Sequence, residues 1–184
     1  MLANHRLKTL FPILLYILFI AISAQLTLVV PVGESTIPIT GQTYAVLTGA
    51  ALLGSRTALL GTVLYVLFGG IGLPIFADGK VGWIVVFGNS SGFLLGFIIA
   101  GYLVGKLGER GWNASLSKII LSMTLGTLVI LLLGISRLTY TFGLEKGLAY
   151  GFYPFWQGAV VKIIAGALTV WGITHWLNAK RAIR

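Results

Sequence analysis

The chain has 184 residues, of which 57% are hydrophobic and 9% are charged, and its mean hydropathy is +0.97. Soluble domains carry about 25% charged residues, so this composition excludes an ordinary cytosolic enzyme and a disordered chain. The absence of cysteine excludes a secreted disulfide scaffold. Basic residues outnumber acidic ones by 13 to 4. Because they separate long apolar stretches, we interpret them as topology signals of an integral membrane protein, not as a nucleic-acid site.

Uncharged runs divide the chain into six candidate membrane segments. A spanning helix needs about 20 apolar residues, and these runs leave little chain for a soluble part, so we predict one membrane domain over residues 1–184. The runs cover residues 9–33, 35–55, 57–77, 81–105, 119–136 and 147–179, and only the last contains a charge, Lys162. The first run is too long for a signal peptide and no small-residue cleavage site follows it, so we predict that it is the first helix.

The distribution of basic residues predicts the orientation. With an even number of helices and both termini in the cytoplasm, three basic residues lie outside: Lys80, Arg137 and Lys146. Nine lie inside: Arg6, Lys8, Arg56, Lys106, Arg110, Lys118, Lys180, Arg181 and Arg184. This asymmetry satisfies the positive-inside rule, while the acidic residues Glu34, Asp78 and Glu145 fall outside. We therefore predict an all-α membrane protein, a six-transmembrane-helix bundle with cytoplasmic N and C termini.

Two segments are too rich in Gly and Pro to be regular helices. Pro38 and Gly41 disfavour a helix interior, so the second segment can be helical only from about Gln42 to about Gly54. Residues 36–41 are then extended backbone near membrane depth, and residues 69–88 are similarly irregular. Backbone at this depth must be buried in protein or line a cavity. The sequence therefore predicts irregular outer loops that cap a ligand cavity.

The chain lacks the residues that membrane catalysis requires. No Asp or Glu lies within an apolar run, the two His residues are at positions 5 and 175, and neither Gly-Lys pair has P-loop spacing. We therefore predict no enzyme activity, no cofactor and no metal.

Lys162 stands out because a charge inside a membrane helix costs about 2.5–3.5 kcal/mol. It could extend to the outer interface, or it could meet a ligand carboxylate in a cavity, as the small residues around it favour.

Further candidate ligand-binding residues come from the irregular loops and from the start of the fourth segment. They are Gln42, Thr43, Tyr44, Lys80, Asn89, Ser90 and Ser91. The GNSSG sequence of residues 88–92 could present backbone N–H groups and hydroxyls to a ligand at a helix N-terminus. Alternatively, Asn89 or Ser90 could be an ordinary helix cap.

Four motifs resemble the BioY family, the substrate-binding S components of energy-coupling factor (ECF) transporters for biotin. They are PITGQTYAVLTGAALLGSR (38–56), GGIGLPIFADGKVG (69–82), GNSSGFLLGF (88–97) and PFWQGAVVK (154–162). The resemblance covers nearly the whole chain. It implies a six-helix bundle in the bacterial plasma membrane that binds biotin near the outer face, and partnership with a transmembrane coupling subunit and ATPases. By position, Lys162, Gln42, Lys80 and Ser90 match polar residues of the family motifs.

The chain departs from the family motifs near the expected ligand. Where the family has an Asp three residues before the Lys, this chain has Ala159. At the second, fourth and sixth positions of the family motif G-P-[ST]-G-G-Y, this chain has Asn89, Ser91 and Phe93. One hypothesis is that Asn89, Ser91 or Asp78 provides part of the hydrogen bonding to the ligand that the missing Asp would provide. The other is a changed ligand, such as a biotin precursor.

Two other classes of protein stay open on the sequence. One is a solitary or self-associating transporter of biotin or a precursor that works without ATPases, and the other is a structural membrane protein without a ligand.

The resemblance to S components also implies that the first helix contacts the coupling subunit through small residues. Ala21 and Ala24 fit that use, and they fit packing within the bundle equally well.

Overall fold

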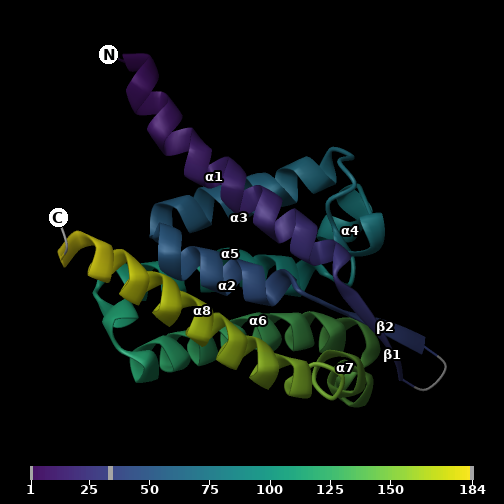
Figure 1. Cartoon of the computed structure of the whole chain (residues 1–184). Coiled ribbons are helices and arrows are strands. Elements are labelled where there is room, and N and C mark those ends of the chain that lie inside the picture. Colours follow the sequence, from purple (N-terminus) through teal and green to yellow (C-terminus); the bar gives the residue numbers. More distant parts are fainter. Residues whose placement is uncertain (1, 33–34, 183–184) are drawn as a thin grey trace.

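The structure is a computed structural model that describes residues 2–32 and 35–182, so Glu34 and Arg184 lie outside it (Figure 1). Six longer helices form the bundle: α1 (Leu2–Gln25), α2 (Gln42–Leu53), α3 (Ser55–Gly70), α5 (Ser91–Glu109), α6 (Leu116–Phe142) and α8 (Trp156–Ala182). Shorter elements connect them: β1 (Thr27–Val32), β2 (Ser35–Thr40), η1 (Ala77–Gly79), α4 (Trp83–Phe87), η2 (Trp112–Ala114) and α7 (Leu144–Gly151). The predicted all-α fold is confirmed in part: the described chain is mostly helical, but it also contains two strands.

A β-hairpin follows the first helix. Strands β1 and β2 pair antiparallel, with Thr27 opposite Thr40 and Val32 opposite Ser35. The prediction that residues 9–33 are helical throughout is wrong beyond Gln25. The sequence TLVVPV of β1 explains the difference, because β-branched residues favour strands and Pro31 disfavours a helix interior. The predicted extended backbone over residues 36–41 is confirmed up to Thr40 by β2.

The second helix has the predicted limits, and the segment of residues 69–88, which we predicted to be irregular, is more ordered than expected. Helix α2 begins at Gln42 and ends at Leu53, and Gly54 has φ +86, which favours glycine and redirects the chain into α3. Residues 71–82 are irregular as predicted, but α4 adds a short helix before α5. Helix α7 was not predicted, and α8 starts at Trp156, within the last uncharged run of residues 147–179.

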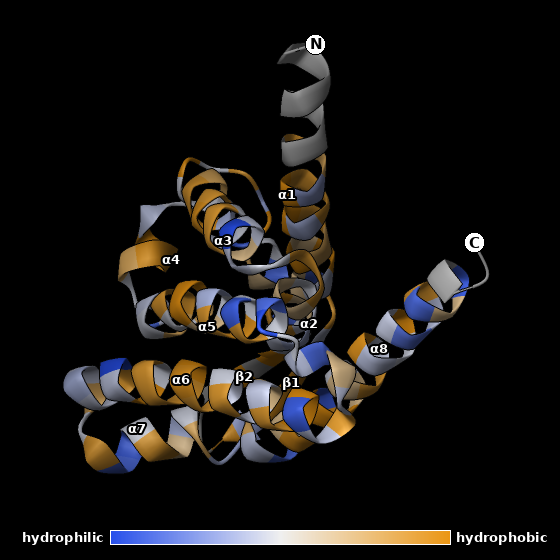
Figure 2. Cartoon of the chain, turned by 90° about the vertical axis from the view of Figure 1, so that its left-hand side faces the viewer, coloured by the Kyte–Doolittle hydropathy of each residue, from blue (hydrophilic) through white to orange (hydrophobic). Residues whose placement is uncertain are grey.

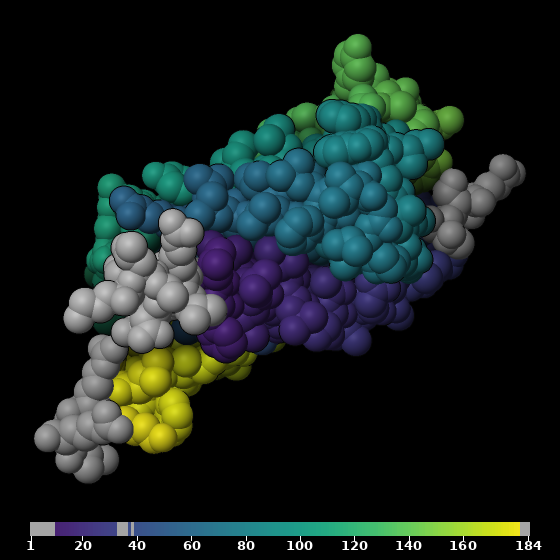
Figure 3. Space-filling model, turned by 90° about the horizontal axis from the view of Figure 1, so that it is seen from above, coloured from purple at the N-terminus to yellow at the C-terminus, as the bar shows by residue number. Residues whose placement is uncertain are grey.

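Small residues allow an aromatic ring from α1 to enter the bundle. Tyr16 is 1% exposed, and its hydroxyl donates to the Val46 carbonyl at 2.8 Å. An added Cβ at Gly49 or at Gly61 would lie 2.5 Å from the Tyr16 ring, so α2 and α3 hold the ring from both sides. Helix α1 consequently lies alongside α3, as Figure 3 shows. Ala24 is fully buried in this packing and presents no surface to a partner.

Within the described residues, three helices are long and apolar enough to cross a membrane by length and composition: α5, α6 and residues Trp156–Lys180 of α8. Shorter apolar helices cover Leu10–Gln25 and Gln42–Leu53. Apolar residues are spread over the outer faces of the bundle, whereas polar residues gather toward the C-terminal end of α8 (Figure 2). The apolar helices and this exposed apolar surface together indicate a membrane protein.

The hairpin and the chain ends lie at opposite ends of the bundle. Helix α1 begins and α8 ends toward one end, while the hairpin and α7 lie at the other (Figure 1). The junction of α2 and α3 lies at the end of α5, where the Glu109 carboxylate accepts hydrogen bonds from the backbone N–H and the hydroxyl of Ser55, each at 2.7 Å. The cavity lies at the opposite end of the bundle, beside the hairpin and α7.

Candidate ligand-binding site

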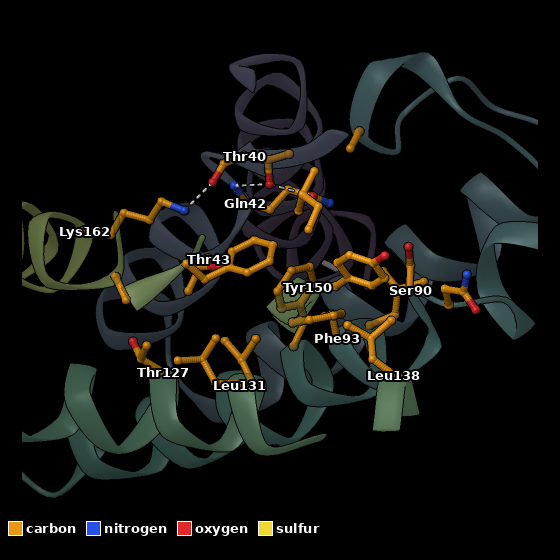
Figure 4. Close-up of a pocket in the computed structure, with 18 of the residues that line it drawn as sticks. Thr40, Gln42, Thr43, Ser90, Phe93, Thr127, Leu131, Leu138, Tyr150 and Lys162 are labelled. Atoms are coloured by element: carbon orange, nitrogen blue, oxygen red, sulfur yellow. Dashed lines mark hydrogen bonds between the residues drawn. The ribbon is translucent and has the colours of Figure 1, made fainter. Parts of the chain in front are cut away.

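A cavity of about 400 Å³ lies among the hairpin, the loop that precedes α4 and the helices α2, α5, α6, α7 and α8 (Figure 4). Cavities of about 300–1,000 Å³ are typical of small-molecule sites. Its lining is mostly apolar, with a few polar groups from separate elements. The polar or charged lining residues are Thr40, Gln42, Thr43, Lys80, Asn89, Ser90, Thr127, Tyr150 and Lys162.

The structure brings six of the eight predicted binding residues to this cavity: Gln42, Thr43, Lys80, Asn89, Ser90 and Lys162. The other two, Tyr44 and Ser91, are not among its lining residues. One helical residue turns the side-chain direction by about 100°, so Tyr44 points toward α8, where its hydroxyl lies 3.0 Å from that of Thr169. The Ser91 hydroxyl instead accepts a hydrogen bond from Arg137 at 2.9 Å.

Lys162 joins the second turn of α8 to the end of the hairpin. Its Nζ donates to the carbonyl oxygen of Thr40 at 2.6 Å, and the side chain is only partly exposed. The Lys162 ammonium group is therefore held at the end of the hairpin. Among the residues that the structure describes, it forms no ion pair. Since a carboxylate is a stronger acceptor for an ammonium group than a neutral carbonyl, an acidic ligand in the cavity could compete for this cation.

Gln42 lies at the centre of a buried hydrogen-bond network. The Thr40 hydroxyl donates to Gln42 Oε1 at 2.8 Å, and Gln42 Nε2 donates to the Tyr65 hydroxyl at 2.7 Å. Tyr65 in turn donates to the Ile75 carbonyl at 2.8 Å. Gln42 is 7% exposed. Because its amide has two N–H groups and one of them is donated to Tyr65, one N–H is left for a ligand. The network ties β2, α2, α3 and the loop before α4 into one wall.

Lys80, Asn89 and Ser90 form the exposed rim of the cavity. Lys80 Nζ lies 3.7 Å from a carboxylate oxygen of Asp78, and both side chains are well exposed, at 57% and 41%. Ser90 occupies the N-cap position of α5, but its side chain makes no capping hydrogen bond. The interpretation of Ser90 as an ordinary side-chain cap is therefore wrong. Asp78 is paired with Lys80 and is not itself a lining residue.

Sequence reasoning missed the contribution of α6 and α7 to the cavity. Both Thr127 on α6 and Tyr150 on α7 line it, together with Leu131, Leu138 and Phe142. An aromatic wall continues across Phe93 and Phe155, whose ring centroids are 5.6 Å apart. The apolar run of α6 predicted a span but not which face meets the cavity, and the brief helix α7 gave no signal.

The charges of the cavity favour an anionic ligand. Its lining residues include Lys80 and Lys162 and, within the described part of the chain, no Asp or Glu. Ala159 lines the cavity at the position where the family motif has an Asp. The cavity therefore combines two cations, several neutral donors and an aromatic wall.

Comparison with known proteins identifies the family. The model of the BioY family matches residues 1–179. The chain belongs to the BioY family. A biotin transporter BioY of Thermotoga maritima is 34% identical over 140 residues, covering 76% of this chain and 80% of the relative. The biotin transporter BioY2 of Lactococcus lactis is 33% identical and covers 92% and 91% of the two chains.

A solved structure shows the same fold. The chain matches the crystal structure of the S-component for biotin from an ECF-type ABC transporter with a TM-score of 0.81, over 94% of this chain and 93% of the other. At 22% identity this likeness shows the fold alone. The curated BioY relatives are transporters. Transport is not an enzymatic function, in agreement with the prediction that this chain is not an enzyme.

Proposed function

We propose that this protein is a substrate-specific membrane subunit that binds biotin from outside and delivers it across the membrane with an ECF coupling subunit and ATPases. The observation that carries the proposal is the position of Lys162, a cation without an ion-pair partner among the described residues, at a cavity with an aromatic wall. Biotin has matching chemistry, because it carries a carboxylate on an apolar chain and a ring system with urea N–H and carbonyl groups. The BioY relatives support the choice of biotin.

In the proposed complex, Lys162 transfers its hydrogen bond from the Thr40 carbonyl to the biotin carboxylate. The ring system lies against Phe93, Phe155 and Tyr150. The remaining N–H of Gln42, the Thr43 hydroxyl and the rim residues Asn89 and Ser90 are available to its polar atoms. Tyr44 and Ser91 then contribute through packing and loop geometry instead of direct contact.

The proposal includes the six-span arrangement with both termini in the cytoplasm, in a bacterial plasma membrane. The six longer helices correspond in order to the six uncharged runs. The junction of α2 and α3, next to Arg56, lies toward the end of the bundle where α1 begins, and α7, which contains Lys146, lies toward the hairpin end (Figure 1). By the positive-inside rule, the cavity then opens toward the outside.

Calorimetric titration of the detergent-purified protein with biotin tests the binding step. A hydrogen bond to a charged group contributes about 1.5–3 kcal/mol, so Lys162→Ala should weaken binding by roughly 10- to 150-fold. Lys162→Gln keeps a donor for Thr40 and isolates the loss of charge. Lys146→Ala is the matched control, because Lys146 on α7 is exposed and does not line the cavity. Wild-type affinity in both Lys162 variants would contradict the assignment.

Biotin uptake by cells that cannot synthesise it tests the transport step. We expect uptake to require co-expression of a coupling subunit and ATPases with intact nucleotide sites. Equal uptake by the chain alone would favour the solitary transporter, and no binding of biotin alongside tight binding of dethiobiotin would favour a precursor as ligand.

A further inference from the structure

Arg137 of α6 holds the segment that joins α4 to α5. Its Nε donates to the Gly88 carbonyl at 3.3 Å and to the Ser91 hydroxyl at 2.9 Å, and one Nη donates to the Phe87 carbonyl at 3.2 Å. The other Nη contacts Thr141 of its own helix at 3.1 Å. Three hydrogen bonds thus cross from one side chain to a segment about 50 residues away in the sequence.

The two residues between these anchor points, Asn89 and Ser90, line the cavity. Both are exposed, and the structure gives Ser90 no side-chain capping hydrogen bond. Figure 4 shows Ser90 at the cavity wall opposite Lys162. The start of α5 also touches α6 at this point, since an added Cβ at Gly92 would lie 2.7 Å from the Cβ of Arg137. Arg137 is therefore placed to set the position of this part of the wall.

The partners of Arg137 indicate a geometric role. Within the described part of the chain it forms no ion pair, so carbonyl and hydroxyl oxygens satisfy its charge. The Phe87 carbonyl lies at the end of α4, where helical carbonyls lack intrahelical partners. The Gly88 carbonyl also accepts a hydrogen bond from the Ser91 backbone N–H at 3.1 Å. A guanidinium group has five donors in a rigid plane, whereas an ammonium group is a compact charge on a flexible stem. Only arginine can engage three such acceptors in fixed directions.

We infer that Arg137 is a positioning residue for ligand binding: it fixes the backbone of residues 87–91 so that Asn89 and Ser90 face the ligand, without touching the ligand itself. Arg137 is not a lining residue of the cavity, whereas its neighbour Leu138 is. The inference rests on the proposed binding function and adds to it a residue outside the cavity that controls affinity.

Biotin titration of matched variants tests this role. We expect Arg137→Met to raise the Kd about tenfold, which is about 1.4 kcal/mol, and Arg137→Lys to have a smaller effect. Thr141→Val is the control, because it removes the partner on α6 and leaves the contacts to residues 87–91 intact. In the background Asn89→Ala/Ser90→Ala, Arg137→Met should have no further effect, since nothing is left to position. An equal loss in that background would overturn the inference.

A measurement without ligand separates this inference from the proposed function. Hydrogen exchange of the ligand-free protein in detergent should show faster exchange of the amides of residues 88–92 in Arg137→Met than in Thr141→Val, with the rest of the bundle unchanged. Unchanged exchange in this segment would overturn the positioning role whether or not biotin binds. If the wild-type protein does not bind biotin, the proposed function fails, and the exchange data alone decide whether Arg137 fixes the segment.

Discussion

Two buried tyrosines make a matched pair that separates stability from ligand binding. Tyr65 is fully buried, and its hydroxyl joins Gln42 to the Ile75 carbonyl at the cavity wall. Tyr16 is equally buried, but its hydroxyl contacts Val46 and Thr62, away from the cavity. Replacing either by Phe removes one oxygen atom and leaves the ring packing intact. Any difference between the variants therefore reports on what each hydroxyl holds in place.

The structure sets the expected size of each effect. Tyr65→Phe removes two short hydrogen bonds, of 2.7 and 2.8 Å, so at about 0.5–1.5 kcal/mol each the free energy of unfolding should fall by roughly 1–3 kcal/mol. Tyr16→Phe removes one short hydrogen bond of 2.8 Å and a weak one of 3.5 Å, so we expect a fall of about 0.5–1.5 kcal/mol. Only Tyr65→Phe frees the amide of Gln42, and it should weaken biotin binding by roughly three- to tenfold, or about 0.7–1.4 kcal/mol.

Unfolding by SDS in mixed micelles gives the stabilities, and calorimetry gives the biotin affinities. If both variants lost affinity in proportion to stability, the network around Gln42 would have no specific role in binding. Unaltered affinity in Tyr65→Phe would refute the argument directly, because the Gln42 side chain would then need no fixed orientation.

Two further predictions concern packing and the cavity rim. Gly61→Ala places a methyl group 2.5 Å from the Tyr16 ring and should lower the free energy of unfolding by about 1–3 kcal/mol. Gly172→Ala on α8, where nothing lies within 4 Å, should be neutral or slightly stabilising in the same SDS titration. Lys80→Ala should slow biotin association at low ionic strength in stopped-flow measurements, and the difference should shrink at high salt, because exposed rim charges act mainly on the association rate. A salt-independent change for Lys80→Ala would instead indicate a direct contact.

Some parts of the fold and the site were predictable because they depend on local chemistry. Pro38 and Gly41 disfavour a regular helix, and the structure accordingly has β2 followed by α2 from Gln42. The isolated charge of Lys162 in an apolar segment predicted a cavity residue, and it lines one. The end of the first helix was missed because apolar β-branched residues fit either a strand or a membrane helix, and only pairing with β2 selects the strand.

By itself, the sequence determined the membrane character, the order of the helical segments and the set of polar residues near the hairpin. Charge and apolar content control these features residue by residue. Only the tertiary structure decided which side chains meet. Tyr44 turns to Thr169 while its neighbour Thr43 faces the cavity, and Lys162 meets the Thr40 carbonyl 122 residues away. Helix rotation and packing decide which side chains form such pairs. The sequence around Arg137, for example, does not indicate that its partner Ser91 lies 46 residues away.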